Sequence, residues 1–237
     1  MPYTFESRVR FSEAGENGRL TLPGILDYFQ DCCTFQADSI NQGQQELAKR
    51  NRVWVLSAWQ IDVARFPEHG ESIVTATYPY KLHGFIGLRN FTMDTKDGER
   101  LAWANSFWTF LNLSTGIPEK LREEDLEGYV LDEKLDMEYL PRKIALPKDM
   151  QECEPFEVQK HHLDANHHVN NGQYVHIAAD YLPDGYTFSR LRAEYRQQGR
   201  LGDLFCPVIG REDNRTVVAI LDKKGDPYAV AEFTDRA

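Results

Sequence analysis

Residues 21–40 read TLPGILDYFQDCCTFQADSI, the stretch from which the fold can be worked out. Its apolar side chains recur at steps of three and four residues, which is the spacing of an amphipathic helix. They are Leu22, Ile25, Leu26, Phe29, Cys33, Ala37 and Ile40. Thr21 is a suitable N-cap and Pro23 suits a first turn, so a helix is predicted over residues 22–40. Because apolar side chains cover much of its circumference, we expect this helix to be buried.

Strand-like segments follow the helix. In residues 53–66, VWVLSAWQIDVARF, Trp59, Ile61 and Val63 alternate with Gln60 and Asp62, which is the pattern of a half-buried strand. Further strand-like runs are ESIVTATYPYK (71–81), FIGLRNFTMD (85–94) and RLAWANSFWTFLN (100–112), with HG and KDG as turn signals between them. The first half is therefore predicted to contain a short strand, a long helix and an antiparallel meander.

The second half of the chain repeats this order. A shorter apolar stripe consists of Tyr174, Ile177, Ala178, Tyr181 and Leu182, and strand-like runs lie near residues 189–198, 203–211, 216–223 and 228–235. HGESIVTATY (69–78) matches LGDLFCPVIG (201–210), and KDGERLAWA (96–104) matches KKGDPYAVA (223–231). A gapless match of the two helix starts also pairs Asn17 with Asn166, Arg19 with His168 and Asp31 with Asp180. The shared order of these matches predicts a duplicated α+β unit.

The two halves are joined by a segment rich in acids and prolines, residues 113–155. A short helix is expected near 119–126, and the rest is too long for a compact loop. We therefore predict an N-terminal domain over residues 1–113, a linker over 114–155 and a C-terminal domain over 156–237. The fold that fits is an α+β tandem double hotdog, in which a curved antiparallel sheet wraps a long central helix in each unit. An ordinary two-layer α+β sandwich would give much the same pattern.

Composition limits the class of protein. Hydrophobic residues make up 41% of the 237 residues, enough for a packed core, and the net charge of −10 argues against general nucleic-acid binding. No apolar run approaches the roughly 18 residues that span a bilayer. The opening MPYTFESRVRFSE lacks the features of a signal or transit peptide, so we expect a cytoplasmic protein. The four cysteines lack disulfide or zinc spacing and are expected to be reduced and mostly buried.

Residues 161–175, HHLDANHHVNNGQYV, hold the densest group of polar side chains in the chain. Asp164, Asn166 and His168 alternate, so in an extended segment all three would project from one face. Asn170 and Asn171 then open a helix, whose free backbone N–H groups favour negative charge. No cysteine or HExxH-like spacing completes a zinc site, so neither a metal nor a cofactor is expected.

The stretch DANHHVNNGQY (164–174) resembles the D-x-N-x-H-V-N-N-x-x-Y motif of acyl-acyl carrier protein thioesterases of the plant and bacterial type. The order of the two halves and a TGIP segment after the aromatic strand also fit that family. The resemblance implies a tandem double-hotdog hydrolase that releases free fatty acids from acyl carrier protein in fatty acid biosynthesis. The partner would be acyl carrier protein with the acyl chain on its phosphopantetheine. A homodimer is left open.

The chemistry of a thioester suggests roles for these residues. Its thiolate leaves readily, so hydrolysis needs mainly a positioned water or nucleophile and donors for the oxyanion. We expect His168 to act as general base or to polarise the carbonyl, and Asn166 to position water or the thioester. Asp164 would orient His168, or itself attack or activate water. The alternative is that these three residues only cap and shape the loop.

Candidate substrate-binding residues have structural alternatives as well. Asn170 also fits a helix N-cap, Asn171 would open the same helix, and Tyr174 fits core packing with a hydrogen-bonded hydroxyl. Trp54 and Trp59 are candidates for an apolar acyl channel, although ordinary core packing is the favoured explanation of both. The resemblance implies that the first half mainly shapes the acyl pocket.

One position departs from the family pattern. A catalytic Glu is expected on the strand after the motif, and in EYRQQGRLGD (194–203) the matching residue is Gln198. The Cys that follows this Glu in plant members is matched here by Gly199. An amide can hydrogen-bond a water or the thioester but cannot serve as a base. Gln198 is therefore a candidate site residue that leaves the base chemistry to Asp164 and His168, or weakens the activity.

Docking of the acidic acyl carrier protein to an acidic chain would need a local basic surface. Two clusters are candidates: Lys49, Arg50 and Arg52, and Arg190, Arg192, Arg196 and Arg200. Arg192, Arg196 and Arg200 are expected on one strand face with Gln198. Two rival functions remain open, an acyl-CoA thioesterase and a non-catalytic acyl-binding protein.

Overall fold

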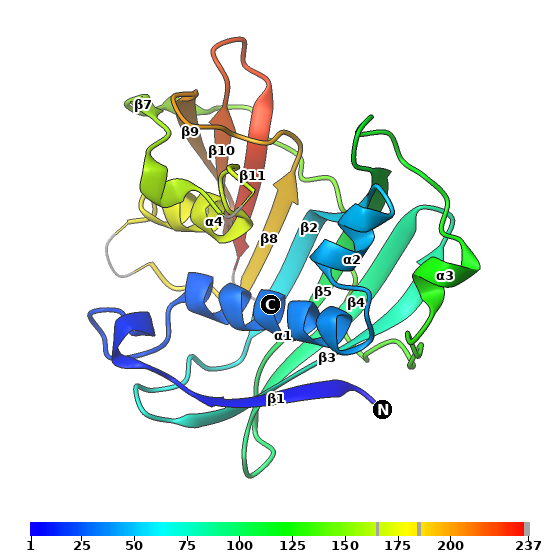
Figure 1. The fold of residues 1–237 in the computed structure, drawn as a ribbon. Helices are drawn as coiled ribbons and strands as arrows, with labels where there is room; N and C mark the ends of the chain where they lie inside the picture. Colours follow the sequence, from blue (N-terminus) through cyan, green and yellow to red (C-terminus); the bar gives the residue numbers. More distant parts are fainter. Residues whose placement is uncertain (165, 184–185, 235–237) are drawn as a thin grey trace. The chain divides into compact units, whose positions relative to one another are not determined.

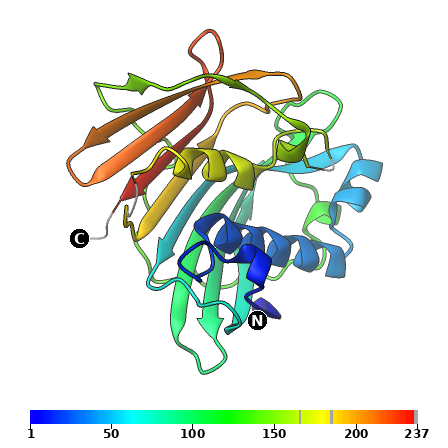
Figure 2. The same ribbon diagram turned by 90° about the vertical axis from the view of Figure 1, so that its left-hand side faces the viewer.

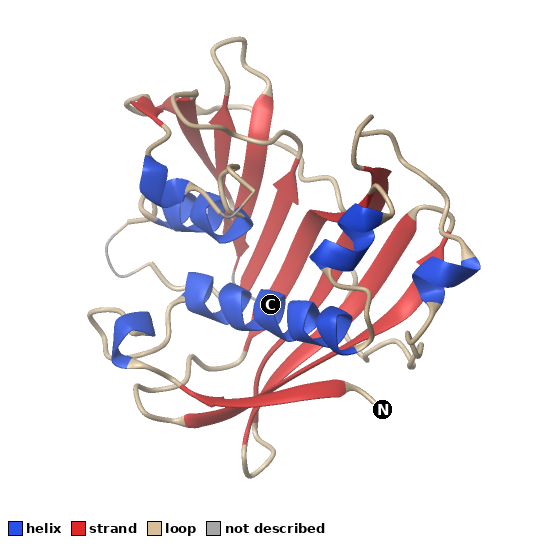
Figure 3. Cartoon of the chain, in the orientation of Figure 1, coloured by secondary structure: helices blue, strands red, loops and turns tan. Residues whose placement is uncertain are grey.

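The computed structural model describes residues 1–164, 166–183 and 186–234 and divides into two compact units. The first unit comprises Met1–Ser57 and Ile61–Tyr139, and the second comprises Ala58–Gln60 and Leu140–Ala237. The chain passes from one unit to the other after Tyr139, inside the segment predicted to connect the halves. In both units strands predominate over helices (Figure 3).

The first unit is an antiparallel sheet with one long helix. Its strands are β1 (Tyr3–Arg8), β2 (Arg52–Val63), β3 (Ser72–His83), β4 (Ile86–Thr95) and β5 (Arg100–Asn112), in the order β1-β3-β4-β5-β2. Its helices are α1 (Leu22–Ser39), α2 (Gln44–Lys49) and α3 (Glu123–Leu126), with a 3₁₀ turn η1 at Phe11–Glu13. Helix α1, the long blue helix of Figure 1, packs on β1 and β3.

Helix α1 confirms the prediction over residues 22–40 and ends at Ser39. The Thr21 hydroxyl accepts a hydrogen bond from the Gly24 amide at 3.2 Å, which caps the first turn. Ile25, Leu26 and Phe29 are fully buried, so the apolar stripe forms the core of this unit.

The second unit has the same kinds of element. Its strands are β6 (Gln151–Glu152), β7 (Phe156–Glu157), β8 (Arg190–Tyr195), β9 (Leu204–Glu212), β10 (Arg215–Leu221) and β11 (Pro227–Thr234). The order is β8-β11-β10-β9, and β6 and β7 both pair with β9. A 3₁₀ turn η2 (Lys160–His162) precedes helix α4 (Asn171–Ala179). Helix α4 packs on β10 and β11, the orange and red strands that lie above the yellow helix and to its left in Figure 2.

The repeat expected from the sequence appears in the strand register. The pair Arg8↔Ser72 of β1 and β3 corresponds to Glu157↔Leu204 of β7 and β9. The pair Asp94↔Arg100 of β4 and β5 corresponds to Leu221↔Pro227 of β10 and β11, and both ladders have an irregularity at that point. The turns that follow contain Gly98 and Gly225, each with φ of 88°. Each unit therefore uses the same strand order and the same turn positions.

Strand β2 differs from its prediction as a half-buried strand. Gln60 and Asp62 are 4% and 1% exposed, so the polar residues of the alternation are buried as well as the apolar ones. A buried polar group needs a hydrogen-bond partner, and the Gln60 side-chain oxygen accepts one from the Leu140 amide at 2.9 Å. Alternation of residue type therefore did not reveal which face of β2 is covered.

Part of the predicted linker is fixed to the first unit by charged groups. Helix α3 places Asp125, whose side chain is fully buried, against Arg52 at 2.7 Å and Arg50 at 3.2 Å. The Arg122 amide donates to the same carboxylate at 2.9 Å, and Arg52 also pairs with Glu119 at 3.1 Å. Burial of such a carboxylate is tolerated because its oxygens are all engaged.

Two further features concern the described residues as a whole. None of their helices combines the length and the apolarity that a membrane crossing requires. All four cysteines lie among them as free thiols, with Cys32 and Cys33 buried and Cys153 and Cys206 half-buried. Burial raises the pKa of the Cys32 thiol to about 12 and that of Cys33 to about 11. The two buried thiols therefore stay protonated at neutral pH.

We expect Asp125→Ala to lower the free energy of unfolding by about 3 kcal/mol, because the Arg52 guanidinium stays buried after losing its closest carboxylate. Urea denaturation measures the change. Glu46→Ala is the control, since it breaks the exposed pair with Lys49 and should cost less than about 0.5 kcal/mol. Equal unfolding midpoints for the two variants would contradict this account of the connection.

Candidate functional site

The predicted site residues lie on a tight turn between η2 and α4. Leu163 and Val169 form an isolated β-bridge, and the Asp164 amide donates to the His168 carbonyl oxygen at 2.8 Å. This bond makes Asp164 and His168 the two ends of the turn. Asn166 lies exposed near its tip, and His167 has a positive φ of 60°. Residue 165 lies outside the described residues.

The turn corrects the expectation that Asp164, Asn166 and His168 project from one face of an extended segment. The Asp164 side-chain oxygen Oδ1 accepts the backbone amides of Asn166 at 2.8 Å and of His168 at 3.3 Å. An Asp that accepts from amides two and more residues ahead folds the chain back on itself, which overrides strand alternation. Asp164 and His168 are still brought together, by the closing of the turn. Both of these hydrogen bonds use Oδ1 and neither uses Oδ2.

The start of helix α4 follows the turn directly. Asn170 is the N-cap, and its side-chain oxygen accepts from the Gly172 amide at 2.7 Å, so the capping alternative is confirmed. Asn171 is the first helical residue, and its carbonyl oxygen accepts the Tyr195 hydroxyl at 3.0 Å. The Asn170 side-chain oxygen is therefore already used by the fold.

Gly199 joins the turn to the segment that follows β8. Its carbonyl oxygen accepts the Val169 amide at 2.9 Å, and its own amide donates to the Tyr174 hydroxyl at 2.8 Å. Tyr174 is 3% exposed, so the core-packing alternative with a hydrogen-bonded hydroxyl is confirmed for this residue. Val169 follows His168 and Gly199 follows Gln198. The hydrogen bond between Val169 and Gly199 therefore brings the backbones of His168 and Gln198 close together.

Gln198 lies outside the strand on which it was predicted. β8 ends at Tyr195, so Arg196, Gln198 and Arg200 do not share a strand face with Arg192. The Arg196 and Gln197 amides both donate to the Tyr228 carbonyl oxygen, at 2.8 and 3.2 Å, and this turns the chain out of the sheet. The side chain of Gln198 is exposed and so accessible to a ligand.

The first unit contains the same turn with Asn17 in the place of Asn166, but without the acid and the histidine at its ends. There the Gly15 amide donates to the Arg19 carbonyl oxygen at 2.9 Å, and the Leu20 amide donates to the Pro67 carbonyl oxygen at 2.8 Å. Asp164 and His168 thus correspond to Gly15 and Arg19, and Gln198 corresponds to the residue before Pro67, Phe66. The backbone adopts this turn without a carboxylate or an imidazole at its ends. The side chains of the second unit are therefore additions to a turn that the fold already forms.

Glu194 is a buried carboxylate on β8, close in sequence to Gln198. Burial tends to raise its pKa, but hydrogen bonds from Arg196 at 2.9 Å and from the Ile144 amide at 3.1 Å outweigh this and lower it. The carboxylate is therefore ionised, and its oxygen Oε2 is already used by the fold. It does not replace the missing Glu at position 198.

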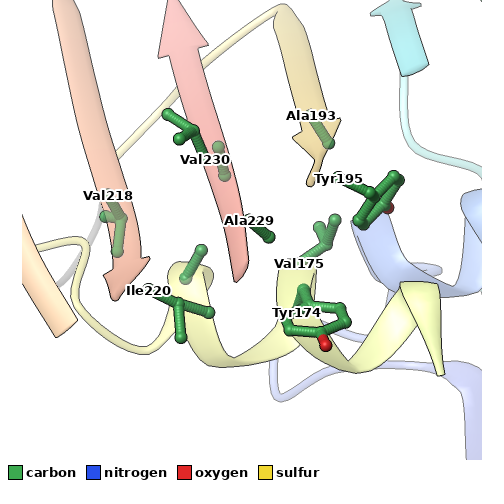
Figure 4. Close-up of a pocket in the computed structure, with 10 residues that line it drawn as sticks. Tyr174, Val175, Ala193, Tyr195, Val218, Ile220, Ala229 and Val230 are labelled. Atoms are coloured by element: carbon green, nitrogen blue, oxygen red, sulfur yellow. The ribbon is translucent and has the colours of Figure 1, made fainter. Parts of the chain in front are cut away.

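Trp54 and Trp59, predicted to line an acyl channel, are both on β2. Trp54 is half-buried with its ring 4.7 Å from that of Phe110, and Trp59 is 2% exposed. The gap beneath α4 involves neither of them (Figure 4). Its lining comes from α4, β8, β10 and β11 and includes Tyr174, Ala178, Ala193, Tyr195, Ala229 and Ala231. It contains no space as wide as a water molecule, so it is a packed part of the core and not a cavity.

The neighbouring histidines have structural surroundings. His161 and His162 lie in η2, and only His161 is exposed. The His162 nitrogen Nδ1 accepts the Gln159 amide at 3.0 Å, and burial together with His161 lowers the pKa of His162. In the part of the chain that the structure describes, no three or more His, Cys, Asp and Glu side chains are grouped to hold a metal ion.

The two basic clusters predicted to dock an acidic partner are largely neutralised within the fold. Arg192 pairs with Glu232 at 2.6 Å, and Arg196 pairs with Glu194 at 2.9 Å. In the other cluster, Lys49 pairs with Glu46, while Arg50 and Arg52 pair with Asp125. Counting cations along the sequence overlooked these acidic partners, of which Glu232 and Asp125 come from distant segments.

Comparison with known proteins identifies the family. Residues 2–129 match the acyl-ACP thioesterase N-terminal domain, and residues 146–215 match the acyl-ACP thioesterase C-terminal domain. The chain therefore belongs to the acyl-ACP thioesterase family.

Relatives and solved structures agree with this assignment. The chain is 26% identical, over 93% of its length, to the chloroplastic acyl-[acyl-carrier-protein] hydrolase FATB2 of Cuphea viscosissima, of which it covers 55%. It thus spans about half the length of the curated relatives it matches. Its fold resembles an acyl-ACP thioesterase from Bacteroides thetaiotaomicron (TM-score 0.88, 23% identity, 98% of this chain and 96% of that one). It also resembles the 12:0-ACP thioesterase of Umbellularia californica (TM-score 0.83, 20% identity, 99% of this chain and 97% of that one).

We expect Asp164→Ala to cost about 1–2 kcal/mol of folding free energy, because two backbone amides lose their acceptor. Asp164→Asn retains Oδ1 and should stay within about 0.5 kcal/mol of the parent protein, since the turn is kept. Urea denaturation of both variants measures the difference. Equal losses would show that the carboxylate charge, and not the acceptor oxygen, holds the turn.

Proposed function

We propose that this protein hydrolyses the thioester of fatty acyl groups carried on acyl carrier protein and releases free fatty acids in fatty acid biosynthesis. The observation that supports this most is the turn from Asp164 to His168, tied through Val169 and Gly199 to the segment that carries Gln198. The matching turn of the first unit lacks these side chains. Membership of the acyl-ACP thioesterase family supplies the substrate class.

Each residue of the turn has a chemical role in this proposal. His168, half-buried at the end of the turn, accepts a proton from the attacking water or polarises the thioester carbonyl. The exposed amide of Asn166 orients the water or the substrate. Asp164 holds the turn through Oδ1 and orients His168, or presents Oδ2 to water. Gln198 donates a hydrogen bond to the thioester or to the water.

The finer architecture belongs to the same proposal. Each unit is a hotdog, with α1 or α4 as the central helix, and the pair forms a tandem double hotdog. The repeated strand order supports this. The first domain, predicted over residues 1–113, would shape the acyl pocket, residues 114–155 would link, and residues 156–237 would carry the chemistry. Acyl carrier protein as the partner is supported by family membership and not by the neutralised basic clusters.

A non-catalytic acyl-binding protein is the second candidate, and the amide at position 198 is the observation in its favour. An amide cannot take a proton from water at neutral pH. This candidate predicts that acyl groups bind without turnover, even at high protein concentration.

We expect purified protein to hydrolyse an acyl-carrier series of increasing chain length faster than the matched acyl-CoA series. His168→Ala should lower kcat on the order of 10²-fold or more, because the proton acceptor is removed. His161→Ala is the matched control, an exposed histidine of η2 outside the turn, and should leave kcat unchanged. Release of free thiol measures the rates. Binding of acyl groups without turnover would establish the second candidate. Faster hydrolysis of acyl-CoA would show that coenzyme A, and not acyl carrier protein, carries the acyl group of the substrate.

Gln198→Glu should raise kcat by about tenfold or more, because a carboxylate at this position can accept a proton. The control is Gln197→Glu, which adds the same charge at the neighbouring exposed residue and should have little effect. The same thiol-release assay compares the two variants. Equal effects would show that added negative charge, and not the position of the base, changes the rate.

A further inference from the structure

Gly199, Tyr174 and Phe205 are buried and pack closely against one another. The Gly199 amide donates to the Tyr174 hydroxyl at 2.8 Å, and the Tyr174 ring stacks on Phe205 with centroids 5.6 Å apart and planes at 27°. A Cβ atom at position 199 would lie 2.7 Å from Cζ of Phe205 and 2.9 Å from the Tyr174 oxygen. Both contacts are too short for real atoms, so only glycine lets the backbone approach the two rings.

The first unit fills the same three positions differently. Ile25 lies four residues after its N-cap, as Tyr174 does, and Pro67 corresponds to Gly199. Ile73, the partner of Ser7 in β1, corresponds to Phe205, the partner of Phe156 in β7. A proline has no N–H to satisfy and an isoleucine has no hydroxyl to offer.

The two units share some of these contacts and differ in others. Both units keep the hydrogen bond to the carbonyl oxygen of this position, from Leu20 or from Val169. Only the second unit adds a hydrogen bond to the amide, and only the second unit carries Asp164, His168 and Gln198. The hydroxyl–amide contact is therefore not required to form the turn.

The added contact fixes the backbone on both sides of Gln198. Before it, the Arg196 and Gln197 amides are bound to the Tyr228 carbonyl oxygen. After it, Gly199 is held by Val169 and Tyr174. Burial raises the pKa of Tyr174, so its hydroxyl stays neutral and remains an acceptor across the ordinary pH range.

We propose that Tyr174 is a positioning residue that, through Gly199, holds Gln198 in register with the Asp164–His168 turn. This inference rests on the proposed thioester hydrolysis and assigns Tyr174 a role in kcat instead of in substrate binding. Tyr174 does not touch the reacting atoms in this scheme. It acts by restricting the backbone from which the Gln198 amide approaches the substrate.

The test is a double-mutant cycle of Tyr174→Phe and Gln198→Ala, assayed as acyl-carrier thioester hydrolysis well below the melting temperature of each variant. Tyr174→Phe keeps the ring on Phe205 and removes only the acceptor. We expect kcat to fall by about 10- to 100-fold with KM within about twofold, because the reacting groups are displaced without loss of binding surface. In the Gln198→Ala background the same change should have little further effect, because the residue it positions is gone.

The matched control is Tyr28→Phe. Tyr28 is a buried tyrosine of α1 whose hydroxyl donates to Glu13 at 2.7 Å, so its loss tests the general cost of removing such a group. It should lower stability without changing kcat. Retention of kcat in Tyr174→Phe, or the same fall in kcat with and without Gln198, would overturn the positioning role.

Amide hydrogen exchange keeps the inference testable if the parent protein does not hydrolyse thioesters. Tyr174→Phe should then speed exchange of the amides at residues 197–199 by about tenfold or more while β10 and β11 keep their protection. Faster exchange throughout the second unit would show a purely structural tyrosine and overturn the proposal. The absence of hydrolysis in the parent protein would count against the proposed function. Hydrogen exchange tests the role of Tyr174 separately, so failure of the function and failure of the positioning role can be told apart.

Discussion

The hydrogen bond from the Val169 amide to the Gly199 carbonyl oxygen is the contact on which the candidate site depends. It joins two segments about 30 residues apart in sequence, one that closes a turn and one that leaves a strand. Without it, His168 and Gln198 would belong to independent loops. With it, an imidazole and an amide lie on either side of one backbone contact, which suits a reaction that needs a proton acceptor and a hydrogen-bond donor together.

Duplication makes it possible to distinguish what the turn requires from what the chemistry requires. Leu20 and Pro67 make the same backbone contact in the first unit, where Gly15 and Arg19 stand at the ends of the turn. The first unit therefore shows which contacts are enough to form the turn. The excess found in the other copy, an acid, a histidine and a hydroxyl bound to an amide, is the part that packing alone does not explain.

Much of the fold could be predicted, because periodicity reports which residues a helix or strand buries. Two local signals predicted structure correctly. The apolar stripe that begins at Leu22 forms helix α1, and Gly98 and Gly225 lie in matching turns. The turn at Asp164 was misread as extended, because side-chain hydrogen bonds to the backbone override alternation. The isolated glycine at 199 was a usable sign of close backbone approach. Its partner Tyr174 could not be inferred, since that contact depends on how α4 packs on its sheet.

The crowding around Gly199 also limits how this sequence can change. Any side chain at this position would need space that the Phe205 ring and the Tyr174 hydroxyl now occupy. A substitution at one of these positions alone would lose packing or create overlap. A side chain at 199 therefore needs compensating changes at 174, at 205 or at both.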